Sequence, residues 1–338
     1  ARTNFVAYSE DFTNAAWNKT DTTVTPDATI APDGTTTADL LTEGTLNSTH
    51  RVYQTVSLTG AGERTVGKYV KYIDAQWCYF RLDDNAAGNA YAYFDVLNGV
   101  TGTTNTDRST ITDVGNGWYY ITASLIDYKV GSNSNVLFGI ASADNTPSYT
   151  GTGRAIYVWG AQLELGSFAS SYIPTTGASA SRAADVATIP TSAFGYNSEG
   201  GTVVVDFNMS FGGTTYPRVW ELGSTIDSQD RINNLVNSSN GNLSASLTTA
   251  NVLQAYETTS TGNTTPLGPV KTAFAWREND VAAVQDGGTV LTDNTATITG
   301  GNPRTVLALG GAVLSSNRLT GHIKSIQYYP RRLSNAQL

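Results

Sequence analysis

Short stretches of alternating hydrophobic and polar residues, each followed by a turn, recur along most of this chain. In AIYVWGAQLEL, residues 155–165, alternation places Trp159 and Leu163 on one face and Ile156 and Gln162 on the other. Alternation over five to eight residues predicts β-strands, and we find no amphipathic helical stretch of useful length. Tyr and Thr, which favour strands, and Gly and Asn, which favour turns, are abundant. The pattern therefore predicts an all-β protein.

The alternation stops after residue 165 and resumes near residue 200. The intervening SYIPTTGASASRAADVATIP is rich in small residues and has a proline near each end, which is typical of a linker. We predict a first domain at residues 1–175, a linker at residues 176–190 and a second domain at residues 191–338. Each domain is long enough for one sandwich of short strands.

The predicted strands follow different patterns in the two halves, so the halves are not repeats. In the first half, strands are predicted near residues 52–58, 63–73, 76–82, 90–96, 117–126, 135–141 and 156–165. In the second half, they are predicted near residues 202–209, 218–224, 231–237, 243–249, 271–279, 281–287, 305–311 and 322–330. The fold class that we predict is two β-sandwiches in tandem.

Composition argues against several classes of function. The chain has 28 acidic and 20 basic residues and a net charge of -8, whereas a nucleic-acid binder would carry a basic patch. No run of about 18 apolar residues occurs, so no membrane insertion is predicted. The start, ARTNFVAYSEDF, has neither a signal-peptide pattern nor an initiator Met, which is compatible with a fragment of a longer protein. The single cysteine, Cys78, excludes an internal disulfide and is expected to be a small core residue.

Aromatic residues supply the strongest chemical signal. In QWCYFRL, AYAYFDV and GWYYITASL, one strand face is rich in aliphatic residues, while the other face carries rings beside hydroxyl or charged groups. Sugar rings stack their C–H faces on aromatic planes and need fixed polar partners for their hydroxyls. The candidate carbohydrate-binding residues are Trp77, Tyr79, Arg81, Tyr91, Tyr93, Asp95, Trp118 and Tyr120. In the alternative interpretation, the rings pack one sheet against another and Trp118 is structural.

Candidate catalytic groups are sparse. The nearest set of paired carboxylates is Glu221, Asp227 and Asp230, but their spacing crosses a turn, so we interpret them as solvated loop acids. The only histidines, His50 and His322, fall in different predicted domains, and no G-x-S-x-G motif occurs. We therefore predict no catalytic residue.

Several motifs carry a resemblance to known families. YSEDFTNAAWNK, APDGTTTADLLTE, GNGWYYITASL and GAQLELGSFASSYIPT, which cover most of residues 1–180 in this order, resemble a module of phage, prophage and gene-transfer-agent tail-fibre, head-fibre or spike proteins. That module is similar to jelly-roll carbohydrate-binding modules. KTAFAWRENDVAAVQDGGTVL, TVLALGG and LTGHIKSIQYYPRRLSNAQL resemble the concanavalin A-like (laminin G-like) sandwich.

The resemblance implies a protein at the surface of a virion or phage-like particle. It implies a jelly-roll carbohydrate-binding domain followed by a laminin G-like domain, and partners that include host cell-surface polysaccharide and other fibre or spike proteins. No cofactor is required, although related modules often hold a structural Ca²⁺. Glu10, Asp11 and Glu164 would meet around such an ion if the first and last strands adjoin, and solvated acids are the simpler interpretation.

Non-catalytic binding of host polysaccharide is the function that we predict, with many copies on an oligomeric particle supplying avidity. Two alternatives stay open. One is a polysaccharide depolymerase or lyase, because lyases often use Tyr together with His or Arg. The other is a structural spacer or assembly module of a fibre, in which the aromatic face would bind another subunit.

Overall fold

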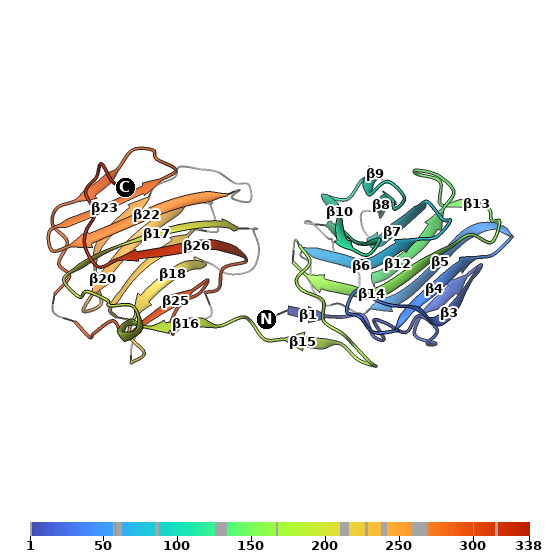
Figure 1. Ribbon diagram of the computed structural model, residues 1–338, viewed down its shortest axis with the longest axis horizontal. Helices are drawn as coiled ribbons and strands as arrows, with labels where there is room; N and C mark the ends of the chain where they lie inside the picture. The colour runs from blue at the N-terminus through green and yellow to red at the C-terminus, as the bar shows by residue number, and fades with distance from the viewer. Residues whose placement is uncertain are drawn as a thin grey trace. The chain divides into compact units, whose positions relative to one another are not determined.

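The computed structural model describes residues 2–56, 58, 63–84, 88–125, 134–166, 168–209, 216–226, 229–237, 242–258, 269–299, 301–314 and 317–338. These residues form β-strands and one short 3-10 helix, η1 (Thr191–Ala193), so the chain is all-β, as predicted (Figure 1). Among them, there is no helix that is long and apolar enough to cross a membrane.

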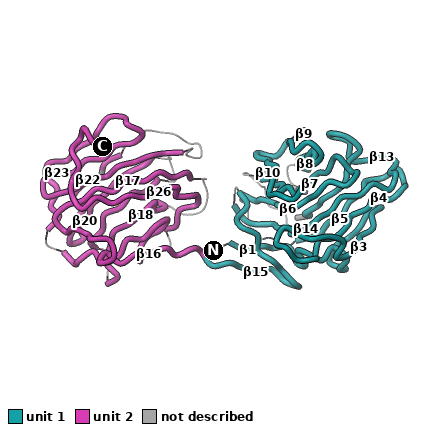
Figure 2. The backbone as a smooth tube through the Cα atoms, in the orientation of Figure 1, with its two compact units in different colours: residues 1–183 teal, residues 184–338 magenta. Residues whose placement is uncertain are grey.

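The chain divides into two compact units, residues 1–183 and residues 184–338 (Figure 2). Parts of the predicted linker are strands. β15 (Ala180–Arg182) pairs with β1 (Arg2–Asn4) in unit 1, and β16 (Ala187–Pro190) pairs with a strand of unit 2. Only residues 183–186 lie between these two strands.

Unit 1 contains two larger antiparallel sheets. The six-stranded sheet has the order β10 (Arg108–Gly115), β11 (Trp118–Leu125), β6 (Arg64–Tyr72), β14 (Ala155–Leu165), β4 (Ala38–Glu43) and β3 (Thr22–Thr29). The seven-stranded sheet has the order β13 (Ser148–Thr150), β5 (Asn47–Val56), β12 (Ser134–Ala141), β7 (Trp77–Asp84), β8 (Gly88–Asp95) and β9 (Val100–Thr104), and β2 (Asn18–Thr20) also pairs with β5.

One hydrophobic core joins the two sheets of unit 1. It contains Val66 of β6 and Ile156 of β14 from the six-stranded sheet, together with Cys78 and Phe80 of β7 and Phe138 of β12 from the seven-stranded sheet. Because both sheets bury one face in the same core, unit 1 is a β-sandwich. Cys78 is fully buried, which confirms its predicted place in the core.

Unit 2 is a second β-sandwich. Its six-stranded sheet has the order β16, β25 (Val306–Leu309), β18 (Arg218–Gly223), β19 (Arg231–Val236), β20 (Leu243–Thr249) and β21 (Val252–Thr258). Its five-stranded sheet has the order β24 (Leu291–Asp293), β23 (Asp280–Gln285), β22 (Val270–Arg277), β17 (Gly200–Met209) and β26 (Gly321–Tyr329).

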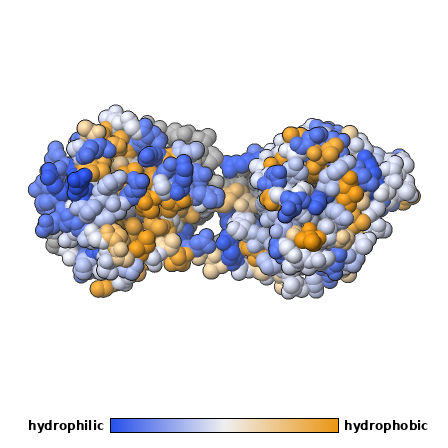
Figure 3. Space-filling view, viewed as in Figure 1, coloured by the Kyte–Doolittle hydropathy of each residue, from blue (hydrophilic) through white to orange (hydrophobic). Residues whose placement is uncertain are grey.

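The core of unit 2 also spans both of its sheets. Trp220 of β18 lies 6.4 Å from Phe274 of β22, measured between ring centroids. Val203 and Phe207 of β17 lie in the same core, on the face where the alternation of GGTVVVDFNMSF places them. On the face seen in Figure 3, hydrophobic and hydrophilic side chains are intermixed in both units.

Candidate functional site

The aromatic residues of β7 and β8 meet on one face of the seven-stranded sheet. The two strands pair antiparallel, with Trp77 opposite Asp95, Tyr79 opposite Tyr93 and Arg81 opposite Tyr91. β7 and β8 are therefore neighbouring antiparallel strands, and residues 85–87 between them lie outside the described residues. Alternate residues of the same strands lie in the main core, so the sequence assigns the two faces correctly.

The rings of Tyr79, Tyr91 and Tyr93 on this face each contact the other two. Together with their neighbours Tyr53 and Trp77, we call them the aromatic face. Tyr79 and Tyr93 stack with centroids 5.4 Å apart, and Tyr93 and Tyr91 stack at 6.1 Å with an interplanar angle of 10°. These residues form a cluster of their own, separate from the main core, with Tyr53 and Trp77 packed against it. Ring spacings of this size are typical of favourable aromatic pairs.

Gly139 of β12 provides the space in which the Tyr79 ring lies. Gly139 is paired with Tyr79 in the sheet, and a Cβ atom at Gly139 would lie 2.5 Å from a carbon of the Tyr79 ring. Such a contact is too short for any side chain. The sheet therefore needs a glycine at this position for Tyr79 to lie flat across β12.

Exposure divides the aromatic face into a floor and a rim. The floor residues Tyr79 and Tyr93 are each only 1% exposed, so these two rings are not open stacking platforms. Burial raises the pKa of Tyr79 to about 12 and raises the pKa of Tyr93 further, so both hydroxyls stay neutral near pH 7. Trp77, Arg81 and Tyr91 are half-buried and keep part of their surface accessible.

The rim also includes two residues of β5 that were not among the candidates predicted from the sequence. Arg51 and Tyr53 lie on the same side of the sheet as Gly139 and Leu137, with which they pair, and both are half-buried. The Arg51 guanidinium carbon lies 5.6 Å from the centroid of the Tyr53 ring. The alternation in RVYQTV could have indicated both residues, but only strand order shows that β5 lies in the same sheet as β7.

The Asp95 carboxylate stabilises the turn that follows β8. It accepts hydrogen bonds from the Leu97 and Asn98 backbone N–H groups at 3.1 and 3.0 Å and from the Gln76 and Asn98 side chains at 2.7 and 2.8 Å. Burial favours the neutral acid, but these hydrogen bonds outweigh it and hold the pKa of Asp95 below its ordinary value. Asp95 is 4% exposed, so its oxygens serve the turn after β8.

Trp118 and Tyr120 lie in the six-stranded sheet and do not join the aromatic face. Trp118 is 2% exposed and donates from Nε1 to the Ile30 carbonyl oxygen at 3.2 Å. The Tyr120 ring lies 4.5 Å from that of Tyr69. Trp118 packs in a cluster with Trp159, against which Tyr69 also packs, as expected for the structural interpretation of Trp118.

The three carboxylates proposed for calcium each have protein partners. Glu10 accepts from the Tyr172 hydroxyl at 3.0 Å, and Asp11 accepts from the Thr13 and Asn14 backbone N–H groups. Glu164 accepts from the Ser170 backbone N–H and hydroxyl, both at 2.6 Å, and is fully buried, so its interpretation as a solvated acid was wrong. In the part of the chain that the structure describes, no group of three or more His, Cys, Asp or Glu side chains is placed to hold a metal ion. The calcium site stays a prediction.

An open acidic hollow of about 540 Å³ lies in unit 1, bordered by Tyr8, Glu10, Asp11, Asp27 and Asp39. Asp39 is 1% exposed and accepts from the Phe12 and Asp27 backbone N–H groups. Burial raises its pKa to about 6 despite these hydrogen bonds.

The carboxylates and histidines that were considered for catalysis interact with other groups of the protein. Glu221 lies 3.3 Å from the Arg218 Nε and accepts from the Val313 N–H, and Asp230 accepts from the Ala250 and Asn302 N–H groups. Both carboxylates are buried and Glu221 lies on β18, so their interpretation as solvated loop acids was wrong. Asp227 lies outside the described residues. His50 is buried in unit 1 with Nδ1 3.1 Å from an Asp21 carboxylate oxygen, and His322 is in unit 2, so the histidines are in different units as predicted.

No family model and no curated protein matches the chain. A solved structure of NanB plus Optactamide is 12% identical, with a TM-score of 0.37, over 45% of this chain and only 25% of the NanB chain. The Ruminococcus gnavus IT-sialidase CBM40 bound to α2,6-sialyllactose is 15% identical, with a TM-score of 0.36, over 41% of this chain and 81% of that chain. Domains LG4-5 of the mouse laminin α1 chain are 10% identical, with a TM-score of 0.31, over 85% of this chain and 89% of that chain. These similarities are too weak to assign a ligand or a site to this chain.

Proposed function

We propose that unit 1 binds carbohydrate, without catalysis, at the aromatic face of its seven-stranded sheet. The observation that carries the proposal is the pair of half-buried rings, Trp77 and Tyr91, beside the buried Tyr79–Tyr93 floor. A half-buried ring presents an apolar plane to a sugar's C–H groups and is held in position by the floor beneath it.

Polar groups around these rings suit the rest of a sugar. Arg51 and Arg81 lie on the same face, and guanidinium N–H groups donate to hydroxyl and carboxylate oxygens. The hydroxyls of Tyr79 and Tyr93 are kept neutral by burial, so the floor adds no negative charge. Binding at one shallow face of this kind is weak, and many copies on one particle would supply avidity.

The ligand that we propose is host cell-surface polysaccharide, and the setting is a virion or phage-like particle. This part of the proposal is supported by the sequence motifs within residues 1–180 that resemble phage fibre modules. In this setting the chain would work as one of several copies, beside other fibre or spike proteins.

The test compares the full chain with Trp77→Ala and Tyr91→Ala variants on a glycan array that includes capsule extracts. We expect each variant to bind the recognised polysaccharide at least about tenfold more weakly, which corresponds to about 1.4 kcal/mol. Tyr329→Ala is the matched control, because Tyr329 is a half-buried ring in unit 2. Unchanged binding by both rim variants, with melting temperatures near that of the wild type, would contradict the proposal.

The same samples separate the two alternatives. Release of new reducing ends from the recognised polysaccharide would indicate a depolymerase. Light scattering with and without glycan would show whether the Trp77→Ala change alters the oligomeric state instead of glycan binding, which would indicate an assembly module.

A further inference from the structure

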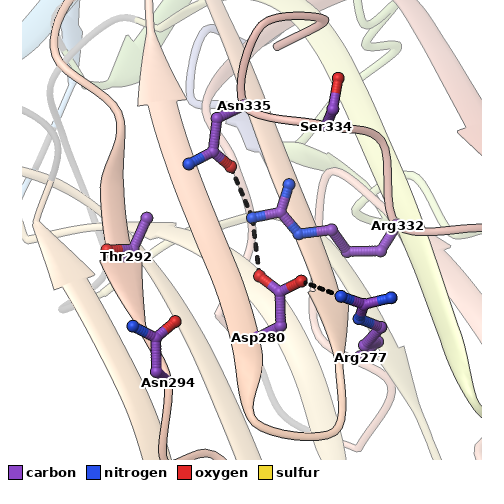
Figure 4. A pocket seen from close by; sticks show the side chains of 7 residues that line it. All are labelled: Arg277, Asp280, Thr292, Asn294, Arg332, Ser334 and Asn335. Carbon is purple, nitrogen blue, oxygen red and sulfur yellow. Dashed lines mark hydrogen bonds and ion pairs between the residues drawn. The ribbon is translucent and has the colours of Figure 1, made fainter.

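A polar hollow of about 490 Å³ opens on unit 2 where the β22–β23 hairpin meets the C-terminal segment (Figure 4). Arg277 and Asp280 come from the hairpin, and Arg332 comes from the C-terminal segment. Amide and hydroxyl groups complete the lining, among them Asn294 and Ser334. The lining is therefore polar, in contrast to the aromatic face of unit 1.

Asp280 holds both arginines at the edge of this hollow. One carboxylate oxygen lies 2.8 Å from an Arg277 nitrogen, and the other lies 2.9 Å from an Arg332 nitrogen. Arg332 also donates to the Asn335 side-chain oxygen at 2.6 Å and to the Leu333 carbonyl oxygen. The Arg332 side chain is 7% exposed, whereas the Arg277 side chain is 64% exposed. Arg332 is thus a buried side chain that is bound to other protein groups, whereas Arg277 faces solvent.

The hairpin fixes the backbone from which Arg277 projects. Arg277 and Asp280 are the closing pair of a two-residue turn. The Asn279 N–H donates to the Ala296 carbonyl at 2.8 Å, and a Glu278 carboxylate oxygen accepts from the Ile298 N–H at 2.8 Å. Because the turn is tied to the neighbouring segment and Asp280 orients the guanidinium, little ordering of the Arg277 backbone is needed on binding.

The charge of the hollow differs from that of the chain. Two arginines and one aspartate give its lining a formal charge of +1, while the chain as a whole carries -8. The nearby Asp293 carboxylate accepts from the Thr295 N–H and hydroxyl at 2.7 and 2.8 Å. Glu278 and Asp293 lie beside the hollow without lining it and add negative charge there, so the attraction for an anionic group rests on the exposed Arg277 guanidinium itself.

We propose that this hollow is a second binding site, for a carboxylate group carried by a saccharide. A guanidinium has five N–H donors, and Asp280 engages one nitrogen of Arg277, so an edge remains for a bidentate contact with a carboxylate. The hollow is much larger than one carboxylate. Its amides and hydroxyls, including Asn294, Thr292 and Ser334, suit the hydroxyls of the attached sugar.

The test uses the full chain with trigalacturonate as the probe and its methyl ester as a neutral match. We expect the acid to bind at least about tenfold more tightly than the ester, and Arg277→Gln to lower binding of the acid by about tenfold or more. Arg277→Lys keeps the charge but loses the planar fork, so it should also bind more weakly. Arg331→Gln is the matched control, since it removes the same charge from an exposed neighbour outside the hollow.

Absence of trigalacturonate binding, equal binding of acid and ester, or unchanged binding by both Arg277 variants would overturn the proposal. Inorganic sulfate or acetate competing as well as trigalacturonate, mole for mole, would reduce the hollow to a general anion site and also overturn it. Trp77→Ala should leave trigalacturonate binding at this hollow unchanged, because Trp77 belongs to unit 1. Failure of this site is thus distinguishable from failure of the aromatic face.

Discussion

The Nζ atom of Lys68 lies 3.9 Å from the centroid of the Phe12 ring, inside the hydrophobic interior of unit 1. The rings of Phe138 and Trp17 are also close, at 4.4 and 5.2 Å. Lys68 is 1% exposed, and among the described residues its Nζ atom has no hydrogen-bond partner. The three rings attract a cation, but burial lowers the pKa of Lys68 to about 7.

Replacing Lys68 with Met should stabilise unit 1. The thioether chain has nearly the same length and leaves no buried ammonium group without a hydrogen bond. We expect the free energy of unfolding at pH 7 to rise by about 1–3 kcal/mol, as measured by urea denaturation. Lys71→Met is the control, because Lys71 lies on the same strand with its side chain only half-buried. A loss of stability in Lys68→Met would show that the ring contacts stabilise the charge.

Lys68 should also make the stability of unit 1 depend on pH. The pKa of Lys68 is about 7 in the folded state, against its ordinary value of 10.5, so between these two pH values the unfolded chain binds more protons. The free energy of unfolding should therefore rise as the pH rises from 7 to 9 and be insensitive to Lys68 below pH 7. Above pH 9 the buried Cys78 thiol, whose pKa burial raises above its ordinary 9.0, opposes this rise, because the unfolded chain loses the thiol proton first. Above pH 10, tyrosines with raised pKa, such as Tyr120, resist ionisation in the folded state, so stability should fall again. Denaturation of Lys68→Met at several pH values should show no rise between pH 7 and 9.

The floor and the rim of the aromatic face should respond differently to truncation. Tyr93→Ala removes a ring that is 1% exposed and stacked on two others, so it should cost about 3–5 kcal/mol of stability. Trp77→Ala removes a half-buried ring and should cost less than half as much. Thermal or urea unfolding of the two variants measures the difference. Equal losses would mean that Trp77 belongs to the floor.

Gly139→Ala should destabilise unit 1 although it adds a single methyl group. The new Cβ would lie 2.5 Å from the ring of Tyr79, and that ring is too tightly packed to move freely. Overpacking of this kind costs about 1–3 kcal/mol. Gly177→Ala serves as the control, because its Cβ would be an ordinary 3.5 Å from the nearest atom, the Tyr8 hydroxyl. Equal stability of the two variants would contradict the steric role of Gly139.

Residues 1–183 and residues 184–338 should each fold when expressed alone, since each unit has its own core. Limited proteolysis of the whole chain should cut between β15 and β16, where Val186 is 68% exposed. Mass spectrometry of the fragments locates the cut. Complete protection of residues 183–186, with one inseparable unfolding transition, would argue for a single cooperative body.

Most central strands were predictable from the sequence, whereas β4 and several edge strands were not. β4 lies inside the six-stranded sheet of unit 1, but its buried Asp39 and Glu43 break the hydrophobic alternation. Every strand predicted from alternation is present, and each has one face in a core. β3 and β10, which form the two edges of the six-stranded sheet of unit 1, were missed. Their residues are mostly exposed on both faces, so their sequences carry no alternation to detect.

The candidate site was predictable only within single strands. Alternation placed Trp77 and Tyr79 on the correct face of β7, because that depends on the period of the strand alone. The burial of Tyr79 depends on Gly139, which lies far along the chain, and the separation of Trp118 from this face depends on which sheet β11 joins. Strand order follows from the packing of the whole unit. No local sequence pattern could therefore indicate the burial of Tyr79 or the separation of Trp118 from the aromatic face.

The space that Gly139 leaves for Tyr79 bears on how quickly a sugar could be bound. Tyr79 and Tyr93 lose their rotamer freedom when unit 1 folds, because their rings are packed on every side. A ligand would then have to immobilise only rim side chains such as Trp77 and Tyr91, at about 0.5–1.5 kcal/mol each. With so little left to rearrange, association should be set by diffusion and orientation, and differences in affinity among glycans should appear mainly in their dissociation rates.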